Sequence, residues 1–385
     1  MPRLVLDADA ARRALSLRDL TDPAAGPHAM QLLVEAVTRR LQSAWRCAVI
    51  MHRASPVVTV ADNYDRLHYP PGGAARDARY TRYLSETTLL RTHTSAMIPP
   101  ALKALAADAE QAPPDVLLAC AGIVYRRDCI DRLHTGEPHQ VDLWRLRRGP
   151  RLTTADLDRM IAEVVEALLP GRAWSTQPAI HPYTEHGRQI DVADQPGAPW
   201  IEIGECGLAL PALLDESGLD TRIWSGLAMG IGLDRAVLLR KGMGDIRLLR
   251  AEDPRVATQM LHLESYRPVS SQPATRRDLS IAVASDASPE ELGDRVRTAL
   301  GDRAELVESI ELVSETTYES LPEPARARLG MTAEQKNVLL RVVIRHPVRS
   351  MTHEEANEVR DDIYAVLHEG VVKHWASRTA RGSRG

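Results

Sequence analysis

The sequence predicts an α+β protein in which a sheet flanked by helices is followed by a small β-α-β-β-α-β domain. Amphipathic helical periodicity over residues 28–45 and 153–169 predicts the flanking helices. Three segments of strand character between residues 179 and 233 predict the sheet. After residue 278 the order strand, helix, strand, strand, helix fits the ferredoxin-like fold. We therefore predict domains at residues 1–265 and 266–370, with a basic flexible tail at 371–385.

Composition places the chain among ordinary globular proteins. Its 385 residues suffice for two or three domains, and 44% of them are hydrophobic and 26% charged. No apolar run approaches the roughly 20 residues needed to span a bilayer, and the acidic N-terminus lacks the pattern of a signal or transit peptide. We expect a cytoplasmic location without a membrane partner. With a net charge of −4, a nucleic-acid partner must be met by local basic patches.

The four cysteines, at positions 47, 120, 129 and 206, show no CxxC spacing. Paired spacing of that kind is the usual signature of a zinc site or a redox pair. The sequence therefore predicts reduced, buried thiols rather than either of these.

The N-terminal half alternates helices and strands around two polar segments. The helix at residues 28–45 leads into an apolar, β-branched run at 47–60, which is broken by Pro56. Residues 62–80, DNYDRLHYPPGGAARDARY, form either an ordered loop over a site or a surface loop. Residues 89–95, LLRTHTS, gather polar side chains that suit either a binding site or a strand end. A helix at 100–107 and a strand at 116–124 are predicted next.

Residues 124–145, VYRRDCIDRLHTGEPHQVDLWR, form the first chemical centre. The pattern is strand, polar loop, strand, with Arg126 at the base and Gln140 and Asp142 on the return strand. A hairpin can bring a cation at its base and acceptors on its return strand to one ligand. An exposed charged hairpin is the alternative.

The helix at 153–169 is followed by strands ending at residue 192 and spanning 200–207 and 224–233. The second of these carries Glu202 and Glu205. Two carboxylates that face a triphosphate usually hold Mg²⁺, whereas carboxylates on a surface hold nothing.

Residues 224–250, WSGLAMGIGLDRAVLLRKGMGDIRLLR, form the second chemical centre. Small residues alternate along its first half, at Gly226, Ala228, Gly230 and Gly232, which lets a bare backbone approach a flat ligand. Arg235 then lies at a strand-to-helix junction, a good place to hold a phosphate. For GxGxxR alone, a buried strand and helix with a chance glycine pattern is the simpler interpretation.

Together these segments resemble phenylalanyl-tRNA synthetases, which are class II aminoacyl-tRNA synthetases built on an antiparallel sheet flanked by helices. Residues 124–145 resemble motif 2 of the family, and residues 224–250 resemble motif 3. The segments DNYD and LLRTHTS, which precede residues 124–145, resemble family segments that precede motif 2. PATRRDLS and MTHEEANEVRDDI resemble the C-terminal anticodon-binding domain of the family. The resemblance covers roughly residues 55–368 and is to the single-chain, organellar type, which lacks the large editing subunit.

The resemblance implies ATP and Mg²⁺ as cofactors and tRNA, expected to be tRNA-Phe, and an amino acid as partners. For the nucleotide it implies roles for Arg126 on the α-phosphate, Arg235 on the γ-phosphate and Glu202 as metal ligand. The remaining residues of the implied ATP site are Asp128, His134, Gly230 and Gly232. For the amino acid it implies a pocket formed by His93, Ser95, Gln140, Asp142, His181, Tyr183 and Ala228. Catalysis would rest on Arg126, Arg235 and His134.

The sequence departs from the family at positions that matter for the pocket. The family's FHQxEG is PHQVDL here, so that Pro138 replaces a phenylalanine and Asp142 a glutamate. The family's FPF segment is replaced by His181-Pro182-Tyr183, and its FAFG segment by LAMG at residues 227–230. The glutamates of motifs 2 and 3 are replaced by Asp128 and Asp234. The chain contains no phenylalanine at all, which genome bias or production under phenylalanine shortage would each explain.

Three functions compete at this point. The first is a ligase that joins phenylalanine, or a close analogue such as a ring-hydroxylated phenylalanine, to tRNA. The second is a paralogue that makes an aminoacyl-adenylate for another acceptor, and the third is a non-catalytic tRNA-binding regulator. Amino-acid activation and tRNA binding are expected on separate domains, in a monomer or a homodimer.

Overall fold

The computed structural model describes residues 5–193, 199–269 and 273–373, which form two compact units. The first unit comprises Met1–Arg126, Glu137–Met243 and Thr258–Tyr266. The second comprises Arg127–Gly136, Gly244–Ala257 and Arg267–Gly385. The chain makes its last passage from the first unit to the second between Tyr266 and Arg267. The sequence did not predict that Arg127–Gly136 and Gly244–Ala257 also belong to the second unit. Most of the predicted tail lies outside the described residues.

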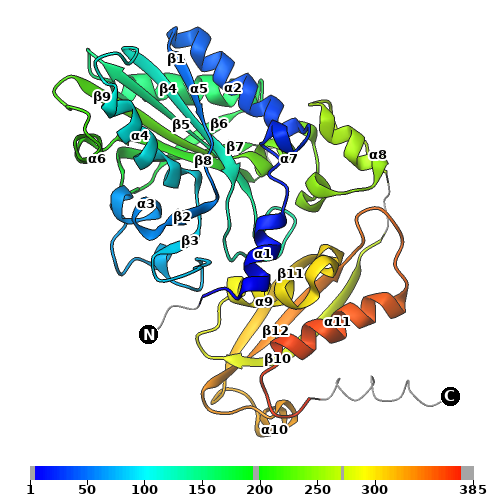
Figure 1. Cartoon of the computed structure of the whole chain (residues 1–385). Helices are drawn as coiled ribbons and strands as arrows, with labels where there is room; N and C mark the ends of the chain where they lie inside the picture. Colours follow the sequence, from blue (N-terminus) through cyan, green and yellow to red (C-terminus); the bar gives the residue numbers. More distant parts are fainter. Residues whose placement is uncertain (1–4, 194–198, 270–272, 374–385) are drawn as a thin grey trace. The chain divides into compact units, whose positions relative to one another are not determined.

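The first unit is built on a seven-stranded sheet with the order β1-β4-β5-β9-β8-β7-β6 (Figure 1). All neighbouring pairs are antiparallel except β1 with β4. Its strands are β1 Ala48–His52, β4 Asp115–Ile123, β5 His139–Arg148, β6 Trp174–Pro178, β7 Thr184–Ala193, β8 Trp200–Ala209 and β9 Trp224–Gly232. A separate pair is formed by β2 Val57–Thr59 and β3 Thr88–Leu90. The predicted antiparallel sheet flanked by helices is thus confirmed.

Helices cover both faces of this sheet. The helices of the unit are α1 Ala8–Ser16, α2 Ala29–Trp45, α3 Val60–Asn63, α4 Ile98–Ala107, α5 Thr154–Leu168, α6 Pro211–Glu216 and α7 Leu233–Lys241. On one face α2 packs against α5, and both lie along the sheet (Figure 1). On the other face, α4 and α6 share a core with alternate side chains of β4, β5 and β9, including Trp144 and Ala228. This second face carries the predicted site.

Local sequence explains where these elements begin and how closely they pack. The α5 helix starts at a capping box in which the side chains of Thr153 and Asp156 each accept a hydrogen bond from the other residue's backbone N–H. Between β8 and β9 the backbones approach so closely that a Cβ on Gly204 would lie 2.3 Å from the carbonyl oxygen of Gly230. Any side chain at position 204 would therefore push these two strands apart.

The second unit contains a three-stranded antiparallel sheet with the order β10-β12-β11 among its described residues. Its elements are α8 Pro254–Ala257, β10 Thr275–Ala284, α9 Pro289–Leu300, β11 Val307–Thr317, α10 Glu323–Leu329, β12 Gln335–Ile344 and α11 His353–Leu367. The predicted order through the second long helix is confirmed. The last strand of a complete β-α-β-β-α-β domain does not occur among the described residues after α11, which end at Lys373.

Residues 127–136 are packed into this second unit. The side chain of Ile130 is buried in the apolar core formed by β10, α9, β12 and α11. The Ile310 N–H donates to the Ile130 carbonyl at 2.8 Å, and the Ile246 N–H donates to the Arg132 carbonyl at 2.9 Å. The tip of the predicted hairpin loop is therefore structurally part of the C-terminal unit.

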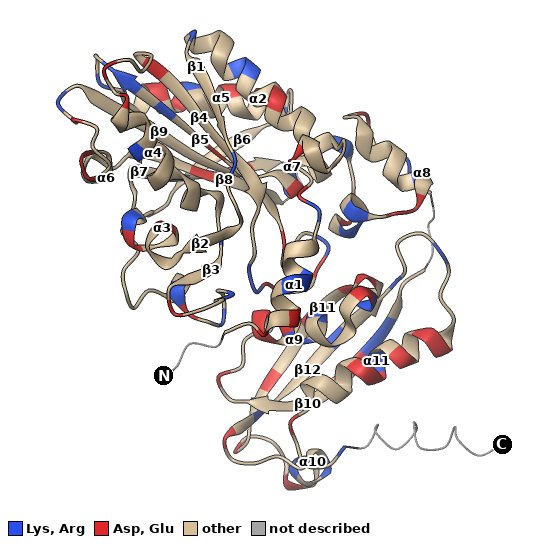
Figure 2. Ribbon diagram, in the orientation of Figure 1, with Lys and Arg blue, Asp and Glu red and all other residues tan. Residues whose placement is uncertain are grey.

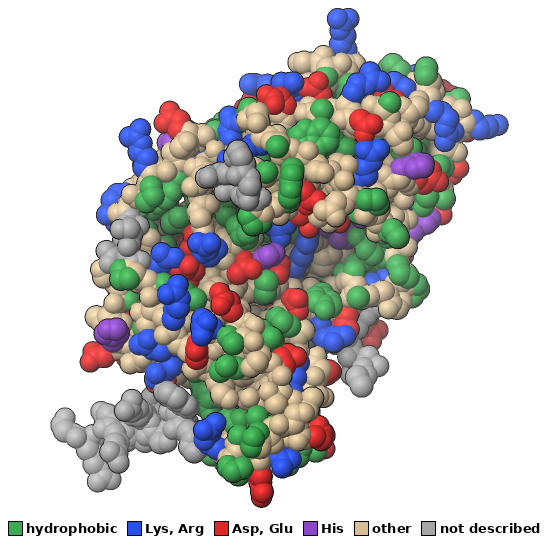
Figure 3. Space-filling model, turned by 180° about the vertical axis from the view of Figure 1, so that it is seen from behind, with side chains coloured by type: hydrophobic (Ala, Val, Ile, Leu, Met, Phe, Trp, Pro, Cys, Tyr) green, Lys and Arg blue, Asp and Glu red, His purple; other side chains and the backbone are tan. Residues whose placement is uncertain are grey.

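Acidic and basic residues are distributed over both units rather than separated by sign (Figure 2). The face shown in Figure 3 likewise mixes the two signs, in keeping with the small net charge of −4. Among the described residues, no helix is long and apolar enough to cross a membrane.

Candidate active site

The predicted amino-acid site is a row of residues across three neighbouring strands. In the register of β5 with β9, Gln140 lies opposite Gly232, Asp142 opposite Gly230, and Trp144 opposite Ala228. In the register of β9 with β8, Gly230 lies opposite Glu205. Because alternate residues of a strand share a face, small residues on β9 line one side of the polar and aromatic residues of β5.

Asp142 is the chemical centre of this row. Its side chain is 2% exposed. Oδ2 accepts a hydrogen bond from the Thr94 hydroxyl at 2.7 Å, and Oδ1 accepts from the Ser95 hydroxyl at 2.9 Å and from the Trp144 indole N–H at 3.1 Å. Burial raises the pKa of Asp142 to about 6, although these three hydrogen bonds oppose the shift. The protein thus holds a buried carboxylate that is ionised at neutral pH and is well placed to bind an ammonium group.

Two further polar residues of the candidate amino-acid site lie on neighbouring segments. The Thr94 N–H donates to Gln140 Oε1 at 3.3 Å, which leaves the amide nitrogen of Gln140 as a donor for a ligand. Burial lowers the pKa of His93 to about 3, and the nearby charge of Arg126 adds to the effect. A hydrogen bond to the Asn63 backbone opposes this shift in the pKa of His93, but neither ring nitrogen has a partner in good hydrogen-bond geometry within the described residues. Buried polar atoms without partners are costly, and a bound substrate would satisfy them.

Aromatic rings surround the carboxylate. The Tyr69 and His93 rings stack with centroids 5.5 Å apart, and Tyr183 lies 6.1 Å from both Tyr69 and Trp144. His181 lies 6.0 Å from Tyr183. Burial raises the pKa of both tyrosine hydroxyls, so they are neutral donors at physiological pH. The candidate site therefore combines aromatic ring faces with hydroxyl and imidazole groups that can form hydrogen bonds.

His181 is itself held by a carboxylate. Its Nε2 lies 3.1 Å from Glu205 Oε2 on β8. This contact lowers the pKa of Glu205, although burial opposes the shift. The sequence did not predict this pair.

The predicted phosphate end lies in the same unit. The Arg126 Nε–H donates to the Thr92 carbonyl at 2.8 Å, and the charge of Arg126 reaches both Glu202 and Glu205. Arg235, in the first turn of α7, donates to the Glu202 carbonyl at 3.0 Å and lies 4.0 Å from the Glu202 carboxylate. Two cations and two carboxylates from separate segments therefore share one region of the sheet.

Gly230 and Gly232 are not required by close packing within the protein. A Cβ on Gly230 would lie 3.7 Å from Asp142 Oδ2, and one on Gly232 would lie 3.7 Å from the Ile203 carbonyl oxygen. Both are ordinary contact distances. Crowding within the described residues therefore does not explain glycine at these two positions.

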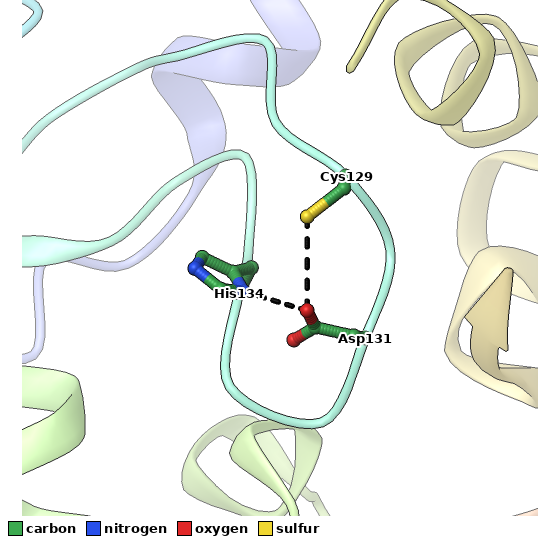
Figure 4. Close-up of side chains that lie close together, drawn as sticks. All are labelled: Cys129, Asp131 and His134. Atoms are coloured by element: carbon green, nitrogen blue, oxygen red, sulfur yellow. Dashed lines mark hydrogen bonds and ion pairs between the residues drawn. The ribbon is translucent and has the colours of Figure 1, made fainter. Parts of the chain in front are cut away.

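Asp128 and His134 are not part of this unit. Both lie in Arg127–Gly136, which belongs to the second unit. The side chain of Asp128 accepts a hydrogen bond from the Cys129 N–H at 2.9 Å, and His134 Nδ1 lies 2.7 Å from Asp131 Oδ2 (Figure 4). The predicted ATP residues are thus divided between two units, with Arg126, Gly230, Gly232 and Arg235 in the first.

Residues 24–260 match the family of class II core domains of tRNA synthetases, in the form designated F. The chain belongs to this family.

Relatives of this class II core are found among phenylalanine–tRNA ligase alpha subunits. The one from Prochlorococcus marinus strain MIT 9313 is 35% identical over 197 residues, covering 51% of this chain and 56% of the relative. The one from Gemmatimonas aurantiaca is 36% identical over 202 residues, covering 51% and 57%. The chain therefore matches just over half the length of these curated relatives. The crystal structure of pyrrolysyl-tRNA synthetase from Desulfitobacterium hafniense matches 59% of this chain and 74% of that one, with 15% identity and a TM-score of 0.44.

Class II synthetases use ATP, and the acidic residues near Arg235 suit the metal that accompanies a triphosphate. Burial raises the pKa of Glu202; the charge of Arg235 opposes the shift, and the carboxylates of Glu205 and Asp191 add to it. A divalent cation would relieve this repulsion. Mg²⁺ usually binds one or two protein carboxylates and completes its coordination shell with phosphates and water. Glu202 could supply such a carboxylate.

Three residues of the candidate site were not predicted from the sequence. Trp144 could have been found, because it lies two residues after Asp142 on a predicted strand and must share its face. Thr94 lay inside the LLRTHTS cluster, but nothing local distinguished its hydroxyl from that of Ser95. Tyr69 stacks on His93 from a distant loop, and no sequence spacing predicts such a contact.

Proposed function

We propose that this protein activates phenylalanine, or a closely related aromatic amino acid, with ATP and transfers it to tRNA. The observation that carries the proposal is the buried carboxylate of Asp142, surrounded by aromatic rings on the site face of a class II core. A buried charge without a counter-charge is costly even when it accepts hydrogen bonds, and the ammonium group of an amino acid would compensate it. The names of the relatives agree with this substrate class.

In the proposed complex, Asp142 accepts hydrogen bonds from the substrate's ammonium group. Gln140 and His93 are the available hydrogen-bond partners for the other polar atoms of the substrate, since each has unused hydrogen-bonding capacity. The side chain of the substrate lies against Ala228 and near His181 and Tyr183. Ser95 has a supporting role, because its hydroxyl already donates to Asp142.

Adenylate formation is an in-line attack of the substrate carboxylate on the α-phosphorus of ATP, with pyrophosphate as the leaving group. The enzyme needs no covalent intermediate, so its task is to position the two reactants and to stabilise negative charge. Arg126 neutralises the α-phosphate and Arg235 the far end of the triphosphate. Mg²⁺ bound at Glu202 would share the charge of the leaving pyrophosphate. Asp128 and His134 remain candidate ATP residues from residues 127–136.

Transfer to tRNA is the second half of the proposal. We assign the recognition of tRNA, tRNA-Phe in the first instance, to the β10–α11 region of the second unit, as an anticodon-binding domain. Its support is the order of elements and the resemblance of its sequence. The proposed activity also implies a cytoplasmic location, where ATP and tRNA meet.

The pocket supports a second substrate within the same class. The hydroxyl of Tyr183 lies close enough to Ser95 and Asp142 for both to influence its pKa, and His181 carries its own carboxylate partner. A pocket with such groups can recognise a ring hydroxyl. Ring-hydroxylated phenylalanines are therefore the first analogues to compare with phenylalanine.

ATP–pyrophosphate exchange over a panel of phenylalanine, tyrosine and the other ring-hydroxylated isomers tests the proposal. Exchange that depends on one of these amino acids, followed by charging of tRNA, is the expected result. Exchange without charging would replace tRNA by another acceptor, and no exchange with any of them would leave a non-catalytic tRNA-binding protein. Light scattering on the purified chain separates a monomer from a homodimer, and co-expression with a bacterial beta subunit tests for a heteromer.

A further inference from the structure

Residues 127–136 hold a cluster of three different metal-ligating groups outside the site described above. The Cys129 Sγ lies 3.7 Å from Asp131 Oδ2, and His134 Nδ1 lies 2.7 Å from the same oxygen (Figure 4). One ligand atom from each residue falls within 4.8 Å of both others. Across residues 5–193, 199–269 and 273–373, this is the one group of three such side chains at this spacing.

The backbone that carries the cluster is already fixed. Arg297 donates to the carbonyl oxygens of Asp128 and Cys129, and the neighbouring carbonyls of Ile130 and Arg132 accept from the N–H groups of Ile310 and Ile246. A Cβ on Gly293 would lie 2.7 Å from the Asp128 carbonyl, so helix α9 packs directly on this turn. The side chains therefore project from a rigid frame, and little ordering entropy remains for a ligand to overcome.

One carboxylate oxygen of Asp131 is oriented by the loop itself. The Leu133 N–H donates to Oδ1 at 2.7 Å, which leaves Oδ2 facing Cys129 and His134. A hydrogen bond to the second oxygen of a ligating carboxylate is the usual support for binding through one oxygen.

The distances suit a small tetrahedral ion. With Zn–S near 2.3 Å and Zn–N and Zn–O near 2.0 Å, tetrahedral angles require S···O of about 3.5 Å and N···O of about 3.3 Å. The corresponding distances here are 3.7 Å and 2.7 Å. The first fits directly, and the second opens by roughly half an ångström when an ion replaces the hydrogen bond between His134 and Asp131.

We propose that Cys129, Asp131 and His134 bind one Zn²⁺ ion, with water in the fourth position. A thiolate, a carboxylate and a neutral imidazole balance the two charges of the ion, and the cysteine proton leaves to solvent. Mg²⁺ and Ca²⁺ prefer oxygen ligands, so the sulfur and nitrogen donors select zinc.

The site escapes the usual cysteine rule because it uses a single cysteine. The lack of CxxC spacing predicts that no zinc site is present, but that rule looks for paired cysteines. Here the spacing is Cys-x-Asp-x-x-His within one turn. The bound ion would fix this turn within the second unit and occupy Nδ1 of His134, so that any contact of His134 with a nucleotide would be made through Nε2.

Metal analysis of the full-length chain provides the test. Protein stripped with a chelator, given excess ZnSO₄ and passed through a desalting column should retain one zinc per chain. In competition with a chromogenic chelator, Cys129→Ser should weaken zinc binding at least about 100-fold. Cys206→Ser, which changes a buried cysteine of the first unit, is the matched control and should bind zinc like the wild type.

A second measurement does not depend on any variant. Replacing zinc by Co²⁺ in the wild-type chain should give a thiolate-to-cobalt charge-transfer band, together with the visible spectrum of a tetrahedral ion. Absence of that band, or retention of zinc by Cys129→Ser at wild-type affinity, overturns the site. Both readouts are independent of amino-acid activation, so they can fail or succeed whatever the catalytic activity.

Discussion

Asp142 and Asp131 are two carboxylates in contrasting settings. Asp142 is enclosed in a sheet, with three side-chain donors from a neighbouring segment and its own strand. Asp131 lies in a loop, half-exposed, with its charge shared between His134 and a backbone N–H. Burial raises the pKa of Asp142, whereas at Asp131 the hydrogen bonds from His134 and the backbone outweigh burial and lower the pKa. Ionisation of Asp142 is therefore unfavourable unless a cation binds beside it, whereas Asp131 is stably ionised without a substrate.

The largest expected effect on activity concerns the two arginines of the candidate site in the first unit. Arg126→Ala and Arg235→Ala should each reduce ATP–pyrophosphate exchange by at least about 10³-fold, because each removes a charge that stabilises the triphosphate in the transition state. Arg240→Ala, further along the same helix as Arg235, is the control and should retain activity. Exchange at the wild-type rate in either site variant would refute the phosphate assignment, provided that thermal unfolding is unchanged.

Asp142→Asn should reduce kcat/KM for the amino acid by about 10²- to 10³-fold, since it leaves the substrate ammonium in a pocket without a counter-charge. The measurement is exchange at varied amino-acid concentration. Asp158→Asn is the matched control, because that side chain is 56% exposed and lies on the α5 surface.

The same carboxylate predicts a pH dependence. Because the pKa of Asp142 is raised to about 6, the free enzyme should lose affinity for the amino acid as the pH falls through 6. Its contribution to folding has the opposite sign: a carboxyl with a raised pKa destabilises the fold when ionised, so protonation between about pH 6 and pH 4 favours the native state. A flat profile of kcat/KM from about pH 5 to pH 8 would contradict the assignment of Asp142 to the ammonium group.

On the loop side, the strongest prediction concerns packing. Ile130→Ala should destabilise the second unit by roughly 2–5 kcal/mol, because it creates a cavity in that core. Leu133→Ala, in the same loop but 36% exposed, should cost no more than about 0.5 kcal/mol. Hydrogen exchange of the β10 and β12 amides reports the difference. Equal protection in the two variants would show that the loop is not part of the second core.

This packing also changes the expectation for a truncation. Separate domains predict that deletion from Tyr266 leaves amino-acid activation intact and removes tRNA charging. Because Ile130 belongs to the second core, the same deletion should also leave residues 127–136 without their supporting contacts. We therefore expect exchange to fall along with charging, to the extent that Asp128 and His134 serve ATP.

The smallest expected effect concerns the ring pocket. Tyr183→Phe removes one hydroxyl from a buried aromatic cluster and should change the preference between phenylalanine and its hydroxylated isomers by about fivefold, the equivalent of one neutral hydrogen bond of about 1 kcal/mol. Competition between paired substrates in the exchange assay measures this ratio. An unchanged ratio would show that Tyr183 does not contact the ring.

The two settings also differ in how far sequence could predict them. Strand periodicity predicts β5, β8 and β9. The resemblance to the family, rather than periodicity, assigned Asp142 and Ala228 to the amino-acid site and Gly230 to the ATP site. The strand β6 was missed because its residues are mostly exposed and carry no apolar pattern. The α1 helix was missed because only one of its residues is buried.

The loop was harder, because its conformation depends on residues far away in sequence. Nothing in residues 127–136 indicates that Arg297 and Ile310 fix their backbone. Likewise, the pairing of His181 with Glu205 joins a turn to a strand across the sheet edge, and local spacing does not encode it. Contacts of this kind are set by tertiary packing, which a single sequence does not display.

The hydrogen bond from Trp144 to Asp142 places an intrinsic fluorophore in the candidate site. The excited state of an indole responds to a charge at its N–H, so the emission of Trp144 depends on whether Asp142 is ionised, protonated or covered by an ammonium group. The chain has six tryptophans, and Trp144 is buried against this carboxylate. Occupancy of the amino-acid pocket can therefore be followed by fluorescence in the unlabelled protein, before any product is formed.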